Sequence, residues 1–121
     1  GNDRVTITAN SVGSYSTWTD AVAGDQIAAA TLITNGGATL GAAVTLAGTS
    51  TFQDYLNAAV VADVNAGGTT WFQFGGNTFV VTDLGANSTT VFNNAEDAVI
   101  CLTGLINLTN STVAANVLTI V

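Results

Sequence analysis

The chain lacks several residue types on which much protein chemistry depends. It contains no lysine, histidine, proline or methionine, and Arg4 is its only cation. Without lysine, a phosphate-binding P-loop and a Schiff base are excluded. Without histidine, a Ser-His-Asp triad and His-ligated zinc are excluded. We therefore expect a protein that is not an enzyme.

Charge is also scarce and almost entirely of one sign. Charged residues make up 7% of the chain, and eight carboxylates give a formal net charge of −7. Such a surface repels polyanions, which argues against nucleic acid and anionic membrane surfaces as partners. Residues 98–121 carry no charge, but Asn and Thr recur throughout this segment, whereas a membrane-spanning helix is predominantly apolar. We therefore expect no transmembrane segment.

The single cysteine, Cys101, excludes an intrachain disulfide. It lies in the apolar run AVICLTGLI, where a small apolar side chain is normally buried. A reactive thiolate needs an electropositive neighbour, and this chain has only one cation to offer. We interpret Cys101 as a buried, inert thiol.

What the chain does contain favours a folded, β-rich protein. Apolar residues make up 48% of the sequence, which is far from the composition of disordered chains. Its polar residues are mainly Thr, Ser and Asn, which favour strands and turns. The length suits one domain covering residues 1–121.

Alternating and β-branched segments predict most of the strands. The expected strands cover residues 4–9, 26–34, 38–48, 69–74, 78–84, 98–102, 105–108 and 117–121. Asn35-Gly36-Gly37 is the expected turn between the second and third of these. Residues 10–20 read as a polar loop or irregular strand that carries Tyr15 and Trp18.

The segment FQFGGNTFVVTD predicts an aromatic β-hairpin. Gly75-Gly76-Asn77 is a turn signal, because Gly and Asn tolerate the positive φ angles of tight hairpin turns. Phe72 and Phe74 share one face of the first strand, and Phe79 and Val81 share one face of the second. Together with Trp71, these aromatic residues are expected in the core, and binding of a glycan or another subunit by exposed rings is the alternative.

One helix is expected over about residues 51–65. Ser50 is the expected N-cap, with Gln53 as its capping-box partner. Phe52, Leu56, Ala59 and Val60 follow at helical spacing, and Gly67-Gly68 form the expected stop. The fold class is therefore mainly β, as a sandwich or a solenoid-like end module with one α-helix. The Gly-Gly-x-Gly-x-Asp repeat of calcium-binding β-rolls is absent from the sequence.

Several motifs in the second half of the chain carry a combined pattern. They are Trp71-Phe72-Gln73-Phe74-Gly75-Gly76, Thr78-Phe79-Val80-Val81 with Asp83, Asp97-Ala98-Val99-Ile100, Leu102-Thr103-Gly104-Leu105 and Val117-Leu118-Thr119-Ile120-Val121. In this combination the chain resembles the carboxy-terminal domain of Gram-negative surface proteins exported by type I secretion, above all S-layer proteins. The hairpin residues of the pattern are Trp71, Phe72, Phe74, Gly75, Gly76, Phe79 and Val81.

The resemblance implies a module of a larger protein that is secreted to the surface of a Gram-negative bacterium. Such tails carry an uncleaved export signal that a type I ABC secretion apparatus reads. The signal would here lie in Val117, Leu118, Thr119, Ile120 and Val121. Other copies of the surface protein are the further implied partners. Calcium is implied only through upstream repeats of the parent protein.

Two alternatives accompany this interpretation. Glu96 and Asp97 form the densest pair of oxygen ligands, so they are weak calcium candidates, although paired carboxylates in a loop more often form turns. Asp20 and Asp25 are weaker candidates still. For function, the alternative to a non-catalytic export and surface-assembly module is an adhesive or carbohydrate-binding β domain of a secreted protein.

Overall fold

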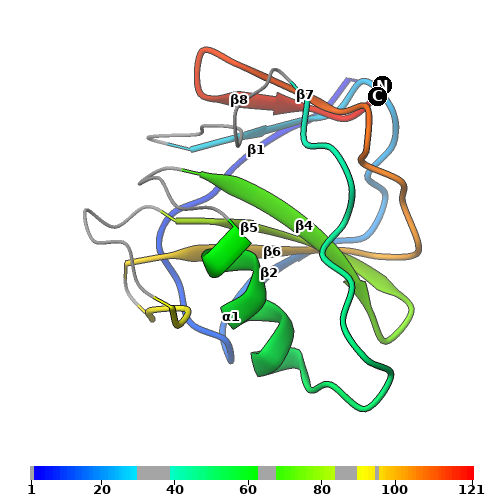
Figure 1. The fold of residues 1–121 in the computed structure, drawn as a ribbon. Helices are drawn as coiled ribbons and strands as arrows, with labels where there is room; N and C mark the ends of the chain where they lie inside the picture. The colour runs from blue at the N-terminus through cyan, green and yellow to red at the C-terminus, as the bar shows by residue number, and fades with distance from the viewer. Residues whose placement is uncertain (1, 30–38, 63–67, 84–89, 95) are drawn as a thin grey trace.

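The protein forms two stacked β-sheets with one helix on the outer face of the second sheet (Figure 1). The computed structural model describes residues 2–29, 39–62, 68–83, 90–94 and 96–121. Eight strands and one helix lie in these residues. The expectation of a mainly β fold is confirmed, and its form is a sandwich with one helix.

Sheet 1 joins the two ends of the chain. Its strand order is β1 (Arg4–Thr6), β3 (Gln26–Ala28), β8 (Val117–Thr119) and β7 (Thr112–Ala114). β1 and β3 are parallel, whereas β8 is antiparallel to both β3 and β7. The last strand of the chain is therefore an interior strand of its sheet.

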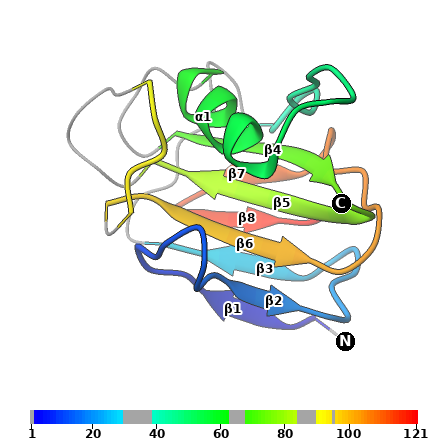
Figure 2. The same ribbon diagram turned by 90° about the horizontal axis from the view of Figure 1, so that it is seen from below.

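Sheet 2 contains the aromatic hairpin. Its strand order is β2 (Ser16–Trp18), β6 (Ala98–Leu102), β5 (Asn77–Thr82) and β4 (Thr69–Phe74). β2 and β6 are parallel, and the other two pairings are antiparallel. Figure 2 shows that β1 and β2 lie on one side of the sandwich, with β7 and β4 on the other.

Helix α1 (Phe52–Ala62) packs on the face of sheet 2 that points away from sheet 1 (Figure 1). The cap lies one residue later than expected. The Thr51 hydroxyl accepts a hydrogen bond from the Asp54 amide (3.1 Å), and the Asp54 carboxylate accepts one from the Thr51 amide (2.9 Å). Thr51 and Asp54, rather than Ser50 and Gln53, therefore form the capping box.

Two apolar clusters lie on the two faces of sheet 2. The first fills the space between the sheets and includes Ile27, Trp71, Ile100 and Leu118. The second lies between sheet 2 and α1 and includes Leu56, Ala59, Val60, Phe72, Phe79, Val81, Val99 and Cys101. β6 is buried on both faces, which explains its uninterrupted apolar sequence.

Two expected strands are wrong. Residues 39–48 have only an isolated bridge between Thr39 and Thr112 in place of a strand. Residues 105–108 are irregular, because side chains bind the main chain of this segment. The Thr78 hydroxyl accepts a hydrogen bond from the Ile106 amide (2.8 Å), and Gln73 Nε2 donates to the Ile106 carbonyl (3.1 Å).

Other expectations are shortened or fall outside the described residues. The strand expected over residues 26–34 is observed as β3, and residues 30–34, like the turn at 35–37, lie outside the described residues. The same holds for residues 63–65 of the expected helix and for Gly67. β7 was not expected. Within the described parts of the chain, no helix is long and apolar enough to cross a membrane.

Candidate functional site

The aromatic hairpin turns at Gly75 and Gly76, as expected. Both glycines have positive φ, at 59° and 85°, and Phe74 pairs directly with Asn77 across the turn. Positive φ at both central residues is typical of the two-residue turns that match strand twist. The third turn residue, Asn77, has a separate task, because its side chain accepts a hydrogen bond from the Gly104 amide (3.0 Å).

The hairpin rings pack inside the protein. Phe72 is fully buried, and Trp71 and Phe79 are each 4% exposed, whereas Phe74 is only half-buried. Phe72 stacks with Phe79 (centroids 5.4 Å apart) and with Tyr55 of α1 (5.0 Å). The expectation of core packing is confirmed for Trp71, Phe72 and Phe79, so these rings are not a surface for glycans.

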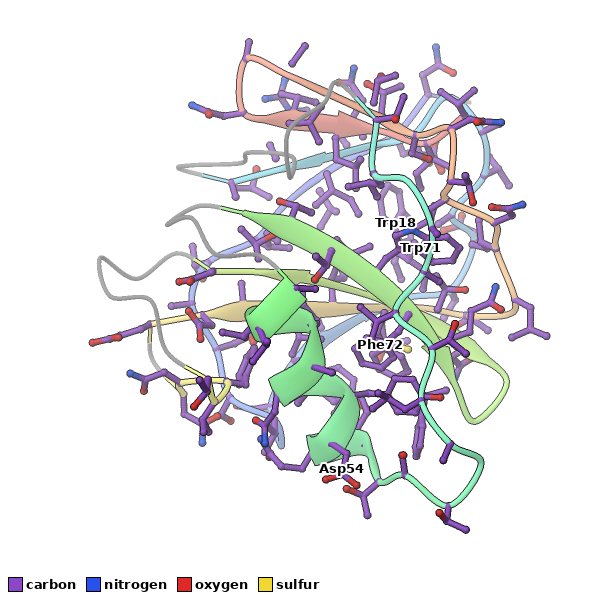
Figure 3. All side chains as sticks on the ribbon, viewed as in Figure 1. Trp18, Asp54, Trp71 and Phe72 are labelled. Carbon is purple, nitrogen blue, oxygen red and sulfur yellow. The ribbon has the colours of Figure 1, made fainter. Side chains whose placement is uncertain are left out.

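Trp71 and Phe72 point to opposite sides of β4 (Figure 3). The Trp71 ring lies between the sheets, and its Nε1 donates a hydrogen bond to the Gly41 carbonyl (2.8 Å). The Val44 amide donates to the Trp71 carbonyl (2.9 Å). Trp71 therefore attaches residues 41–44 to the edge of sheet 2.

The proposed signal segment, residues 117–121, is built into sheet 1. Leu118 is fully buried, and Ile120 is 2% exposed. Beyond β8 the pairing continues, because the Ile120 amide donates to the Asp25 carbonyl (2.9 Å) and the Gly24 amide donates to the Ile120 carbonyl (2.8 Å). Val121 is the exposed end of the segment, at 61%.

The weak calcium candidates Glu96 and Asp97 stabilise a turn by accepting hydrogen bonds from Asn93. The Asp97 carboxylate accepts a hydrogen bond from the Asn93 amide (2.8 Å), and the Glu96 carboxylate accepts one from Asn93 Nδ2 (2.7 Å). The Asp97 side chain is 2% exposed. Among the described residues, no group of three or more Asp, Glu, Cys or His side chains is arranged to hold a metal ion.

Asp20 and Asp25 bind different donors. Asp20 accepts a hydrogen bond from the indole Nε1 of Trp18 (2.8 Å). Asp25 accepts hydrogen bonds from the amides of Asp3 and Val22, both at 2.9 Å. These bonds, the one from Asp3 above all, lower the pKa of Asp25 from its ordinary value. Asp25 thus fixes the loop that leads into β3.

Cys101 is buried on the helix-facing side of β6. Burial raises the pKa of its thiol, and a hydrogen bond with the Thr17 side chain opposes this in part. A protonated, buried thiol is a poor nucleophile. The geometry therefore agrees with the interpretation of Cys101 as a packing residue.

The two sides of the sandwich differ in whether another segment of the chain covers the edge strands. On the β4 and β7 side, residues 39–46 cross from one sheet to the other (Figure 1). Besides their bonds to Trp71, these residues bind the main chain next to β7. The Leu40 amide donates to the Ser111 carbonyl (2.9 Å), and the Gly41 amide donates to the Thr109 carbonyl (3.1 Å). The chain itself therefore covers this side.

The β1 and β2 side has an opening between the two edge strands. A pocket of about 280 Å³ lies here, lined by Asp3, Arg4, Val5, Ser16, Thr17, Trp18 and Ile100. Val5 and Trp18 are only partly buried where they pack against the cluster between the sheets. No motif in the sequence indicates a site at this opening. The lone cation Arg4 and the isolated Trp18 are the two sequence features that belong to this opening. They come together only because β1 and β2 each pair with their own sheet.

The chain matches no protein-family model, and no curated protein matches it.

Proposed function

We propose that the chain is a non-catalytic module of a secreted bacterial surface protein, and that residues 117–121 carry its type I export signal. The observation that carries this proposal is the interior position of β8 between β3 and β7. In the folded protein the apolar side chains of Leu118 and Ile120 are buried. A receptor can therefore read this segment only in a chain that has not yet folded.

The topology supports a long-lived unfolded state before export. β3 pairs with β8, so that Gln26 lies opposite Thr119, 93 residues away in sequence. β2 similarly pairs with β6 across most of the chain. Pairings between distant segments form slowly, because the intervening loop must close before any contact is gained. A transporter that threads unfolded chains benefits from this delay.

The composition agrees with the same function. The net charge of −7 favours solubility outside the cell. The resemblance further implies that the parent protein would bind calcium through repeats upstream of this module. Assembly with other copies at the cell surface is part of the proposal. It follows from the resemblance to S-layer proteins.

The test is export of a passenger fused ahead of the 121 residues, in cells that express a type I secretion system. We expect the fusion in the medium and a fusion lacking residues 117–121 inside the cell. Because this deletion also removes the interior strand β8 and is expected to prevent folding, a second variant must separate signal from fold. Phe72→Ala destabilises the core but retains residues 117–121, so its export should continue.

Three results would count against the proposal. Normal export of the truncated fusion would remove the role assigned to residues 117–121. Retention of the Phe72→Ala fusion together with the truncated one would tie export to folding instead of to the terminal segment. Failure of the complete module to export any passenger would refute the secretion function altogether.

A further inference from the structure

The outer edge of β1 offers main-chain groups for pairing. The Ile7 amide donates to the Ala28 carbonyl, and the Gln26 amide donates to the Asp3 carbonyl, both at 2.8 Å. Successive residues of a strand direct these groups to opposite sides. Since Asp3 and Ile7 face β3, Arg4 and Thr6 direct their N–H and C=O groups away from the sheet. Nothing among the described residues pairs with these outward groups.

β2 forms the opposite margin of the same opening. The Thr103 amide donates to the Trp18 carbonyl (2.9 Å), so Thr17 directs its main-chain groups outward in the same way. Ser16 and Trp18 lie beside Ile100 and Leu102, whose side chains face sheet 1. The pocket between the two edges therefore has an apolar floor of Val5 and Ile100 and a margin of main-chain donors and acceptors.

The β1 and β2 edges differ from the edges on the other side of the sandwich, which residues 39–46 contact. Residues 39–46 bind the main chain of Trp71 on the β4 edge and of Ser111 and Thr112 at β7, so the described chain covers part of both edges there. Unpaired strand edges are sites at which another chain adds as a further strand. In such strand addition the main chain provides affinity, and a pocket that receives alternate side chains provides specificity.

Charge indicates which strand would fit. The exposed Asp3 lines the opening, and the exposed Asp20 accepts the hydrogen bond of the Trp18 indole beside it, against the single guanidinium of Arg4. The whole chain carries a net charge of −7. A second copy of this chain would bring another seven negative charges, whereas a basic strand would be attracted. We propose that the β1 edge binds an extended basic peptide, which adds as a strand and inserts one aliphatic side chain between β1 and β2. This interaction is separate from the export function proposed above.

The probe is an acetylated, amidated heptapeptide of sequence Lys-Val-Thr-Val-Lys-Val-Thr, added to the complete chain and followed by amide NMR. We expect shifts at Arg4, Val5 and Thr6 and at the indole N–H of Trp18. Hydrogen exchange of the Arg4 and Thr6 amides should slow at least tenfold at saturation. The same peptide with every residue N-methylated should not bind, because each amide that could face β1 is then blocked in either strand direction.

Thr6→Pro removes one outward donor without breaking a bond to β3, because proline is tolerated where its nitrogen faces away from the sheet. We expect at least tenfold weaker peptide binding, whereas Thr6→Val, which retains the donor, should bind within twofold of the parent. Ser16→Leu, which fills the pocket from β2, should weaken binding to a similar extent. Ser16→Leu also provides the test if Thr6→Pro does not fold.

Several outcomes would overturn the proposal. They are no shifts at millimolar peptide, shifts centred away from β1, and equal binding of the N-methylated peptide. Undiminished binding by folded Thr6→Pro or by Ser16→Leu would have the same meaning. Concentration-dependent protection of the Arg4 and Thr6 amides without peptide would show that a second copy occupies the edge instead.

Discussion

Truncation of Phe72 tests the packing between sheet 2 and helix α1. The ring is fully buried, lies opposite Phe79 in the strand register, and has Phe52 and Tyr55 of α1 within 5.9 Å and 5.0 Å between ring centroids. Phe72→Ala removes the ring around which these other aromatic rings pack. The space left behind is surrounded by rigid sheet and helix, so collapse around it is limited.

Loss of a buried phenylalanine side chain costs about 3–5 kcal/mol. Phe72 belongs at the upper part of this range, because both the neighbouring strand β5 and the helix contact it. Equilibrium urea unfolding, followed by far-UV circular dichroism, measures the change directly. In thermal unfolding, the same loss corresponds to a decrease in Tm of roughly 10–20 °C for a domain of this size.

Phe74→Ala is the matched control on the same strand and face. Phe74 is half-buried, and its aromatic neighbours among the described residues are Phe52 and Tyr55 (ring centroids 5.6 and 5.7 Å away). Its truncation should cost no more than about 2 kcal/mol, since part of the ring already lies in water. A loss below about 1.5 kcal/mol for Phe72→Ala, or an equal loss for the two variants, would refute the assignment of Phe72 to the centre of this core.

Three further predictions concern charge, backbone and metal. Because the folded-state pKa of Asp25 is lowered, its stabilisation is present above about pH 4 and is lost as pH falls through the folded pKa. Urea midpoints should therefore decrease on acidification, and Asp25→Asn should flatten this dependence; an unchanged slope would contradict it. Gly76→Ala should destabilise by about 1 kcal/mol, since Gly76 has a φ of 85°, whereas Gly48→Ala, at an open site outside the positive-φ region, should be neutral in the same assay. EDTA and millimolar calcium should give the same Tm, and a large rise with calcium would show a site within this chain.

Local sequence patterns were sufficient for the elements with strong signals. The Gly75-Gly76 turn between aromatic strands, the apolar β6 and the helical spacing from Phe52 to Val60 all have the predicted structure. The helix cap was displaced by one residue because Thr51 and Asp54 form the same box as Ser50 and Gln53 would. Neighbouring polar residues of similar capping ability make such a choice difficult from sequence.

The missed elements depend on less usual chemistry. β7 and β8 are joined at Ala115 and Asn116, with φ of 50° and 64°, although alanine is not a turn-forming residue. The segment at 105–108 has the composition of a strand, but Thr78 and Gln73 satisfy its main chain from a neighbouring strand. Only the three-dimensional arrangement provides those partners.

The sequence by itself determined the class of the protein: a β-rich chain with one helix, an inert cysteine and no residues for His- or Lys-dependent chemistry. These properties follow from composition and from patterns within a few residues. Tertiary structure decided that β8 is an interior strand, that residues 39–46 cover one side of the sandwich, and that β1 and β2 leave the other side open. Each of these depends on pairing between distant segments, and a local pattern does not specify which distant strand its main-chain groups will meet.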